Sequence, residues 1–428
     1  MVNRLALSGL IFVVSQLAVG QSVISPYSSF GIGEISNEGL AQNDALGGTG
    51  IGLYHPLHIN VLNPSMLTSN VFSSYQIGIP LESRVIQDGE NSTRSSAGSI
   101  GYIVFAWPIV NEKRNKYRGG GATRLGLMMG AQPFSSANYQ VTSFSSVDNE
   151  PESVVQSNSS FSGGLTKAYI GTGMKLFGDT SGTAISFGAK VNYIFGRLNR
   201  DDERGLINDE LNARPITTRT KTFFKDATLD LGLSFTRKYS AGSRFTLGLA
   251  YNLPMELKGD AELITSYTGT DAATDSLVVE SARTVSIAGK LGIGASWQLN
   301  NKWIFAADYE RRLEDGDNNI DFSNSSKFAL GVEWIPDYRS VKSYWSRVSY
   351  RMGFRSQQLP YLINGQSIRD NSVTLGLSLP LMRYSSTDFS FSLGSRGGTS
   401  NNLVQENYFK MTFGVTINDR WFVRRKYN

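Results

Sequence analysis

The sequence predicts an all-β protein, a 14-stranded antiparallel transmembrane β-barrel with an N-terminal hatch that plugs it. Three observations predict this fold: an export signal, segments of about ten residues that alternate apolar with polar, and connections that alternate between long and short. The composition agrees, because glycine occurs 44 times, aromatic residues make up 11% and charged residues only 18%. Such a composition suits a barrel better than a cytosolic α/β enzyme.

Residues 1–20 have the features of a cleavable signal peptide. Arg4 supplies the positive start, Leu5–Val19 supplies a short apolar core, and the small residues Ala18 and Gly20 precede the cut. The apolar run is too short and too interrupted by polar residues for a helix that spans roughly 30 Å. We therefore expect an exported protein.

The barrel strands are predicted by alternation with a period of two. In Phe245–Leu253 and in Val373–Leu379, large apolar residues occupy every odd position, with small or polar residues between them. Trp297, Trp303 and Trp334 lie near strand ends, as in an interfacial aromatic girdle. Counting such segments predicts fourteen strand cores, at 72–82, 99–109, 123–133, 165–177, 183–196, 225–238, 243–255, 285–299, 302–311, 326–336, 344–355, 371–381, 387–396 and 407–417.

The connections between these segments indicate which side of the membrane each one faces. Long connections at 134–164, 197–224 and 256–284 alternate with short ones such as 179–182 and 300–301. Bacterial barrels have long external loops, short periplasmic turns and an even strand number. Fourteen strands with both chain ends in the periplasm satisfy this pattern, in the outer membrane.

The N-terminal region, 21–71, is rich in Gly, Ser and Asn but contains too many apolar residues for a solvated tail. We therefore expect a hatch folded into the barrel rather than a disordered periplasmic arm. The predicted organisation is a signal peptide at 1–20, a hatch at 21–71, a transmembrane barrel at 72–418 and a periplasmic basic tail at 419–428.

A motif within the expected hatch resembles a known family. Leu46–Gly52 is glycine-rich and is followed by Asn60–Ser65, and this order resembles the hatch of FadL-type outer-membrane transporters. Glycine-rich and Asn-Pro turns also occur in ordinary loops. The residues that carry the resemblance are Gly47, Gly48, Gly50, Asn63 and Pro64. The stretches Ser25–Gly33 and Asn418–Phe422 look like a Bacteroidota branch of FadL-like barrels, with PorV-like barrels as more distant relatives.

Alternation also places a set of charged side chains inside the barrel. On the lipid face each would cost roughly 2–4 kcal/mol near the midplane. We expect these charges to pair across strands and fill the lumen, with a polar path for solute as the alternative. The set comprises Lys190, Asp230, Asp308, Glu310, Glu333, Arg347, Arg351 and Arg355.

The sequence offers little support for an enzyme, a metal site or a cofactor. His55 and His58 are the two histidines, and further metal ligands are not evident near them. Asp315–Asp321 alternates oxygen ligands as calcium loops do, but Ile320 stands where such loops need glycine and Ser326 where they need glutamate. The chain contains no cysteine, which excludes a thiolate nucleophile, a disulfide and a lipid-anchored cysteine.

Two functions are compatible with these features. The FadL-like resemblance implies a conduit for small hydrophobic molecules. The PorV-like resemblance implies a non-transporting barrel subunit of an outer-membrane secretion or assembly complex, bound through its loops or through the basic tail Arg424–Lys426. An open lateral gap or an apolar tunnel favours the first function, and a sealed lumen favours the second.

Outer-membrane lipid, a hydrophobic molecule and protein partners are expected to bind. Nucleic acid is not expected to bind, because basic residues cluster only in the tail.

Overall fold

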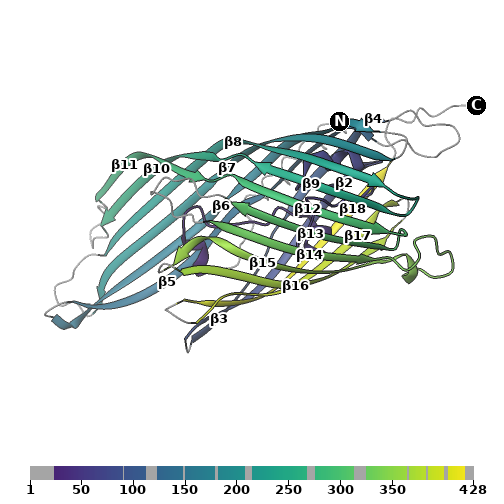
Figure 1. The fold of residues 1–428 in the computed structure, drawn as a ribbon. Coiled ribbons are helices and arrows are strands. Elements are labelled where there is room, and N and C mark those ends of the chain that lie inside the picture. Colours follow the sequence, from purple (N-terminus) through teal and green to yellow (C-terminus); the bar gives the residue numbers. More distant parts are fainter. Residues whose placement is uncertain are drawn as a thin grey trace, which may run out of the picture.

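The computed structural model describes residues 24–89, 91–111, 123–147, 150–178, 182–207, 215–267, 275–312, 324–363, 366–381, 384–399 and 403–419. Their strands form one closed antiparallel barrel of 14 strands, so the predicted fold class is confirmed (Figure 1). The last strand pairs with the first and closes the wall.

Three of the barrel strands are interrupted, and each carries two labels. In chain order the wall consists of β2 (Ser73–Asp88), β3 (Asn91–Gly98) with β4 (Tyr102–Asn111), β5 (Thr123–Val147), β6 (Glu150–Gly178), β7 (Thr183–Ile207), β8 (Ile216–Lys238), β9 (Arg244–Asn252) with β10 (Met255–Tyr267), β11 (Asp275–Ile287) with β12 (Lys290–Leu299), β13 (Trp303–Arg312), β14 (Ser325–Trp334), β15 (Ser349–Ile363), β16 (Gln366–Pro380), β17 (Ser386–Gly397) and β18 (Gln405–Asp419).

Side chains along these strands are arranged the opposite way from those of a soluble protein. Val373 and Leu375 on β16 are about half exposed on the outside, whereas Thr374 between them is buried in the interior. Because lipid solvates apolar groups and the interior holds polar ones, this arrangement is the one a membrane barrel requires. No helix in the described part of the chain is long and apolar enough to cross a membrane.

One side of the wall is much taller than the membrane requires. β5 to β8, with β10 and β11, extend well past the other strands in Figure 1. The expectation of long loops at 134–164, 197–224 and 256–284 is therefore wrong, because most of these residues are strand. Crossing the bilayer takes only about 9–11 residues per strand. Beyond it a strand needs no apolar face, so polar stretches such as Gln156–Ser160 show no alternation.

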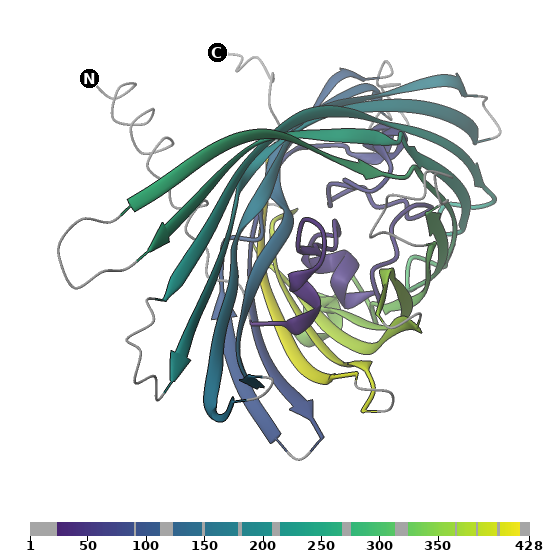
Figure 2. The same ribbon diagram turned by 90° about the vertical axis from the view of Figure 1, so that its left-hand side faces the viewer.

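The N-terminal residues 24–71, here called the lumen segment, lie inside the barrel (purple in Figure 2). The segment contains short elements only: a 3-10 helix η1 (Pro26–Ser29), β1 (Glu34–Ile35), the helix α2 (Ala41–Ala45) and a second 3-10 helix η2 (Pro64–Ser69). Most of its residues from Leu40 onward are buried. The expected signal peptide, the basic tail Arg424–Lys426 and the stretch Asp315–Asp321 lie outside the described residues.

Candidate functional site

A belt of glycines on the inner wall holds the lumen segment in place. Strand register sets these glycines at one level, since Gly173 pairs with Gly188, Gly188 with Gly232 and Gly331 with Gly353. A Cβ added at any of them would meet the lumen segment. Without side chains, the wall lets a second backbone approach closely. The belt comprises Gly126, Gly173, Gly188, Gly232, Gly248, Gly294, Gly331, Gly353 and Gly376.

The glycine-rich half of the motif fits between the wall strands. Gly47 and Gly48 adopt φ values of +70° and +86°, which side-chain-bearing residues rarely adopt. A Cβ on Gly47 would also lie 2.6 Å from the carbonyl oxygen of Phe354 on β15. The Asp308 carboxylate on β13 accepts the backbone N–H groups of Gly50 at 2.6 Å and Ile51 at 2.8 Å. Asp308 thus fastens this turn to the wall.

The Asn-Pro half of the motif joins the turn to η2. Asn63 Oδ1 accepts the N–H of Ser65, which caps η2, and Pro64 occupies the first turn, where its lack of a backbone N–H costs no hydrogen bond. Asn63 Nδ2 donates to the carbonyl of Ile51 at 2.8 Å. The two halves of the motif are therefore one hydrogen-bonded unit that rests on the glycine belt.

We expect the substitution Gly188→Ala to displace this unit in part from the wall and to lower the stability of the protein. The new methyl group would overlap backbone atoms of Pro64 and Ser65, which cannot move aside as a flexible side chain could. Overpacking of this kind costs about 1–3 kcal/mol. Urea unfolding in detergent micelles measures the loss, and Gly398→Ala is the matched control because its Cβ has no neighbour within 4 Å. Equal stability of the two variants would contradict the proposed seat.

A charged cluster seals the lumen near the ends of β14, β15 and β17. Arg351 donates from Nε to Glu333 at 2.5 Å and from Nη1 to Asp388 at 2.9 Å. Its Nη2 lies 3.3 Å from Nε2 of His58, whose ring centroid is 4.4 Å from that of His55. Burial lowers the pKa of both histidines, so both are neutral at physiological pH. The side chains of Arg351, Glu333 and Asp388 are at most 2% exposed.

A second group of charges surrounds the middle of the lumen segment. Lys190 donates to the carbonyl of Val61 and pairs with Asp230, both at 2.9 Å. Glu310 pairs with Lys290 at 2.9 Å and with Lys327 at 2.6 Å. Lys190, Asp230 and Glu310 thus pair across neighbouring strands, and Lys190 also binds the lumen segment. Arg355, in contrast, donates to the hydroxyl of Tyr408 at 3.1 Å.

Arg347 is an exception and does not belong to this network. The sequence placed it on a strand, but it lies in the short 3-10 helix η3 (Trp345–Arg347), before β15 begins at Ser349. Its guanidinium lies over the ring of Tyr344, with the carbon 5.4 Å from the centroid. Arg347 is four residues before Arg351 and therefore in phase with it in the alternation of two. This spacing extended the predicted strand too far toward the N-terminus and misplaced the residue.

A third cluster was not predicted from the sequence. Arg84 on β2 pairs with Glu406 at 2.9 Å and Glu34 at 3.0 Å, and Arg396 pairs with Glu34 at 2.8 Å and Asp370 at 2.9 Å. The same alternation rule could have found the wall residues, since Asp370, Ser372 and Thr374 all face inward on β16. Glu34 carried no such signal because it lies on the lumen segment.

The wall is incomplete where β3 meets β5. Among the described residues, β4 pairs with both β2 and β5, but β3 pairs with β2 alone. The β5 edge at Ser135 and Ser136 pairs instead with β1 of the lumen segment. The strand is interrupted at Ser99–Gly101, where Gly101 N–H donates to the carbonyl of Gly78. A lateral gap therefore interrupts the hydrogen-bonded wall.

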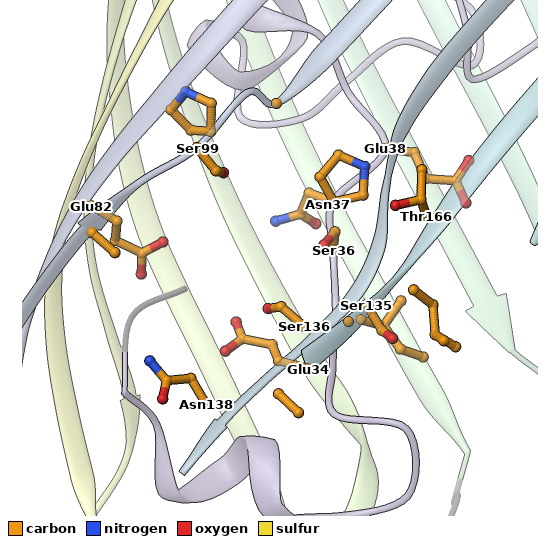
Figure 3. Close-up of a pocket in the computed structure, with 18 of the residues that line it drawn as sticks. Glu34, Ser36, Asn37, Glu38, Glu82, Ser99, Ser135, Ser136, Asn138 and Thr166 are labelled. Atoms are coloured by element: carbon orange, nitrogen blue, oxygen red, sulfur yellow. The ribbon is translucent and has the colours of Figure 1, made fainter. Parts of the chain in front are cut away.

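A cavity of about 1270 Å³ lies at this gap (Figure 3). Figure 3 shows Glu34, Glu38 and Glu82 around it, with Ser99 and Ser135 from the two sides of the gap. Tyr193 and Phe195, which point outward from β7 and are 50% and 40% exposed, also line it. The cavity therefore reaches from the lumen to the outer surface of the wall.

The cavity has a mixed lining in which basic side chains outnumber acidic ones. Its basic members include Lys290, Lys327 and Arg396. Burial opposes ionisation of Glu38, but Lys167, Lys290 and Lys190 hold the pKa of this carboxyl well below its usual value. Glu38 is therefore a carboxylate paired to the wall rather than a proton carrier. In the described part of the chain, no group of three or more His, Asp or Glu side chains is placed to hold a metal ion.

Several solved structures share this fold. The Pseudomonas putida toluene transporter TodX superposes with a TM-score of 0.57 at 15% identity, covering 91% of this chain and 99% of that one. The Ralstonia pickettii toluene transporter TbuX gives 0.53 at 16% identity, covering 89% and 98%. A Pseudomonas aeruginosa FadL homologue gives 0.55 at 12% identity, covering 90% and 98%. These likenesses establish the fold, an outer-membrane-type barrel, and no more.

Sequence comparison identifies the family. A search of curated proteins gives no match. The family model described as BamG, in contrast, matches residues 1–428, which is the whole chain. The chain therefore belongs to the BamG family.

Proposed function

We propose that this protein is an outer-membrane barrel that passes small hydrophobic molecules through the gap between β3 and β5. The observation that carries this proposal is the cavity of about 1270 Å³, which joins the lumen to the outer surface of the wall. A molecule in the cavity would leave sideways without crossing the lumen segment. The similarity in fold to TodX and TbuX, described as toluene transporters, supports the same class of cargo.

The lining favours cargo with a polar or acidic end. Basic side chains in the cavity outnumber acidic ones, and Ile35, Ile100 and Phe224 contribute apolar surface. A carboxylic acid could place its charged end among the basic groups and its apolar end toward the gap. A plain hydrocarbon has no group that could accept a hydrogen bond from these basic side chains.

A tryptophan at the rim of the gap tests this proposal. We expect Ser99→Trp to reduce uptake of a medium-chain carboxylic acid into proteoliposomes to the rate of empty liposomes, because Ser99 lines the cavity where the strand is interrupted. Ser92→Trp is the matched control, since Ser92 is exposed on the same barrel strand and does not line the cavity. Undiminished uptake by Ser99→Trp, or wild-type uptake equal to that of empty liposomes, would refute transport through the gap. Toluene serves as the second probe.

A second function is favoured by the seal, namely a non-transporting subunit of an outer-membrane secretion or assembly complex. Around Arg351, Glu333 and His58 the described residues enclose a cavity of only about 10 Å³, too small for any cargo. The lumen segment joins this cluster through His58, whose Nε2 lies 3.3 Å from Nη2 of Arg351. Purification in mild detergent, with mass spectrometry of bound lipids and proteins, separates the two functions. A stoichiometric protein partner without a bound ligand would favour the subunit, and a bound acyl ligand without a partner would favour the conduit.

A further inference from the structure

The connection between β14 and β15, residues 335–348, differs from its neighbours at the same end of the barrel. The adjacent turns are short, for example 300–302 between β12 and β13 and 239–243 between β8 and β9. Residues 335–348, here called the β14–β15 knob, stand out beyond these turns in Figure 1. Short turns identify this end as periplasmic, so the knob projects into the periplasm.

The knob has a fixed shape. Asp337 N–H donates to the carbonyl of Ser346 at 2.8 Å and ties the two sides of the loop together, while Asp337 Oδ1 accepts the N–H of Arg339 at 3.0 Å. The Tyr344 hydroxyl donates to the carbonyl of Pro380, which lies at the end of β16. A loop ordered in advance loses little conformational entropy when it binds.

The exposed surface of the knob is apolar at its tip and basic around it. Val341 is 98% exposed and Trp345 is 63% exposed. Arg339, Lys342 and Arg347 carry positive charge, and the one acidic side chain, Asp337, is occupied by the backbone of Arg339. With Tyr338 and Tyr344, which are 44% and 40% exposed, Val341 and Trp345 give the knob several uncovered apolar side chains, as at interaction sites.

The position of the knob argues against membrane lipid as its partner. The aromatic girdle at this end is a row of neighbouring rings, with the centroid of Trp303 5.7 Å from that of Trp334 and the centroid of Trp334 5.6 Å from that of Tyr350. Girdle rings mark the level of the lipid headgroups. The knob begins directly after Trp334 and ends before Tyr350, so its tip at Val341 lies beyond that level.

We propose that the β14–β15 knob is a docking site for a periplasmic protein that presents an acidic surface with an apolar recess for Val341. The basic residues around the tip set the charge of the partner, and the exposed valine supplies the buried contact. A second copy of this chain carries the same basic knob, which would repel its own. This inference deepens the second proposed function and does not depend on transport.

Site-specific photo-crosslinking in living cells tests the inference. A benzoylphenylalanine at position 341 should crosslink one periplasmic protein, whereas the same group at Ser240, exposed on a neighbouring turn, should not. The captured protein, purified, is then titrated against the full-length barrel in nanodiscs. We expect Val341→Asp to raise its Kd by about tenfold or more, as loss of a central contact does. Arg339→Glu with Lys342→Glu should weaken binding further at low salt.

The controls keep the outcomes separate. Lys238→Glu makes the same type of charge change at the end of β8, beside the turn 239–243, and should leave Kd unchanged. Each variant must retain the wild-type unfolding midpoint. A crosslink from position 341 to lipid or to a second copy of the chain would overturn the inference. So would equal crosslinking from positions 341 and 240, or no crosslink at all. If a partner co-purifies but does not crosslink at 341, only the knob inference fails. If no partner co-purifies at all, the second proposed function fails with it.

Discussion

Replacing Arg351 by alanine is expected to lower the free energy of unfolding by about 3–5 kcal/mol. The guanidinium is buried between two carboxylates, those of Glu333 and Asp388, and contacts each within 2.9 Å. Its removal leaves two buried negative charges without their partner, which costs far more than the loss of packing alone. Urea unfolding in detergent micelles, followed by tryptophan fluorescence, measures the change.

The loss of unfolding free energy in Arg351→Ala should also depend on pH in a defined direction. Burial lowers the pKa of His58, Asp388 opposes this, and Arg351 lowers the pKa further. Without Arg351 the histidine can take up a proton more readily and partly neutralise the carboxylates. Since that proton is bound in the folded variant, its stabilising effect is present at low pH and lost as pH rises. The deficit of Arg351→Ala relative to wild type should therefore be smaller at pH 5 than at pH 8.

Two further variants separate charge from packing. Arg347→Ala, four residues earlier, should cost little, because Arg347 lies in η3 outside the cluster. Arg351→Met combined with Glu333→Gln and Asp388→Asn removes every charge together and should recover much of the lost stability. A large loss in Arg347→Ala, or no difference between Arg351→Ala and the triple variant, would contradict the arrangement described for the seal.

The fold class could be predicted from the sequence because a membrane imposes a strict pattern on the chain. Alternation such as that of Phe245–Leu253 is required wherever one face meets lipid and the other meets the interior. Each predicted strand core falls on one barrel strand. The lengths of the tall strands could not be predicted, because outside the bilayer a strand such as β6 obeys no such pattern.

The gap in the wall was beyond prediction for a different reason. The sequence placed a strand core at 99–109, yet Ser99–Gly101 is where the strand is interrupted and β4 begins only at Tyr102. Whether an edge stays paired depends on the register of three strands and on competition from β1, which takes the β5 edge at Ser135 and Ser136. Such long-range competition leaves no local pattern.

The inward charges show the same division. Alternation identified Lys190 and Asp230 as facing the interior, and the structure pairs them at 2.9 Å. It could not identify Glu34 or Glu38, because these lie on irregular parts of the lumen segment and acquire their role only from the wall residues around them. Alternation with a period of two therefore identifies the member of an ion pair that lies on a wall strand. It misses the member that lies on the lumen segment.

The second large effect is expected at Asp308, where one carboxylate supports the whole motif turn. Asp308→Ala would leave the buried N–H groups of Gly50 and Ile51 without an acceptor. Each buried donor that loses its partner costs about 1–3 kcal/mol, so the variant should lose about 2–6 kcal/mol. Asp308→Asn keeps an acceptor oxygen in place and should recover part of that loss. Both are measured by urea unfolding in detergent micelles.

The substitution Asp308→Ala should destabilise the turn that contains Gly50 and Ile51 before it destabilises the barrel. Gly50 and Ile51 are held by Asp308 and, through Asn60 and Asn63, by the rest of the motif. The wall, in contrast, is closed by strand pairing that does not involve Asp308. Hydrogen exchange of the peptide containing Gly50 and Ile51 should therefore rise steeply in Asp308→Ala, while exchange within β16 and β17 stays near the wild-type rate. Unchanged exchange at the turn, or equal losses in the alanine and asparagine variants, would show that Asp308 does not fasten the lumen segment to the wall.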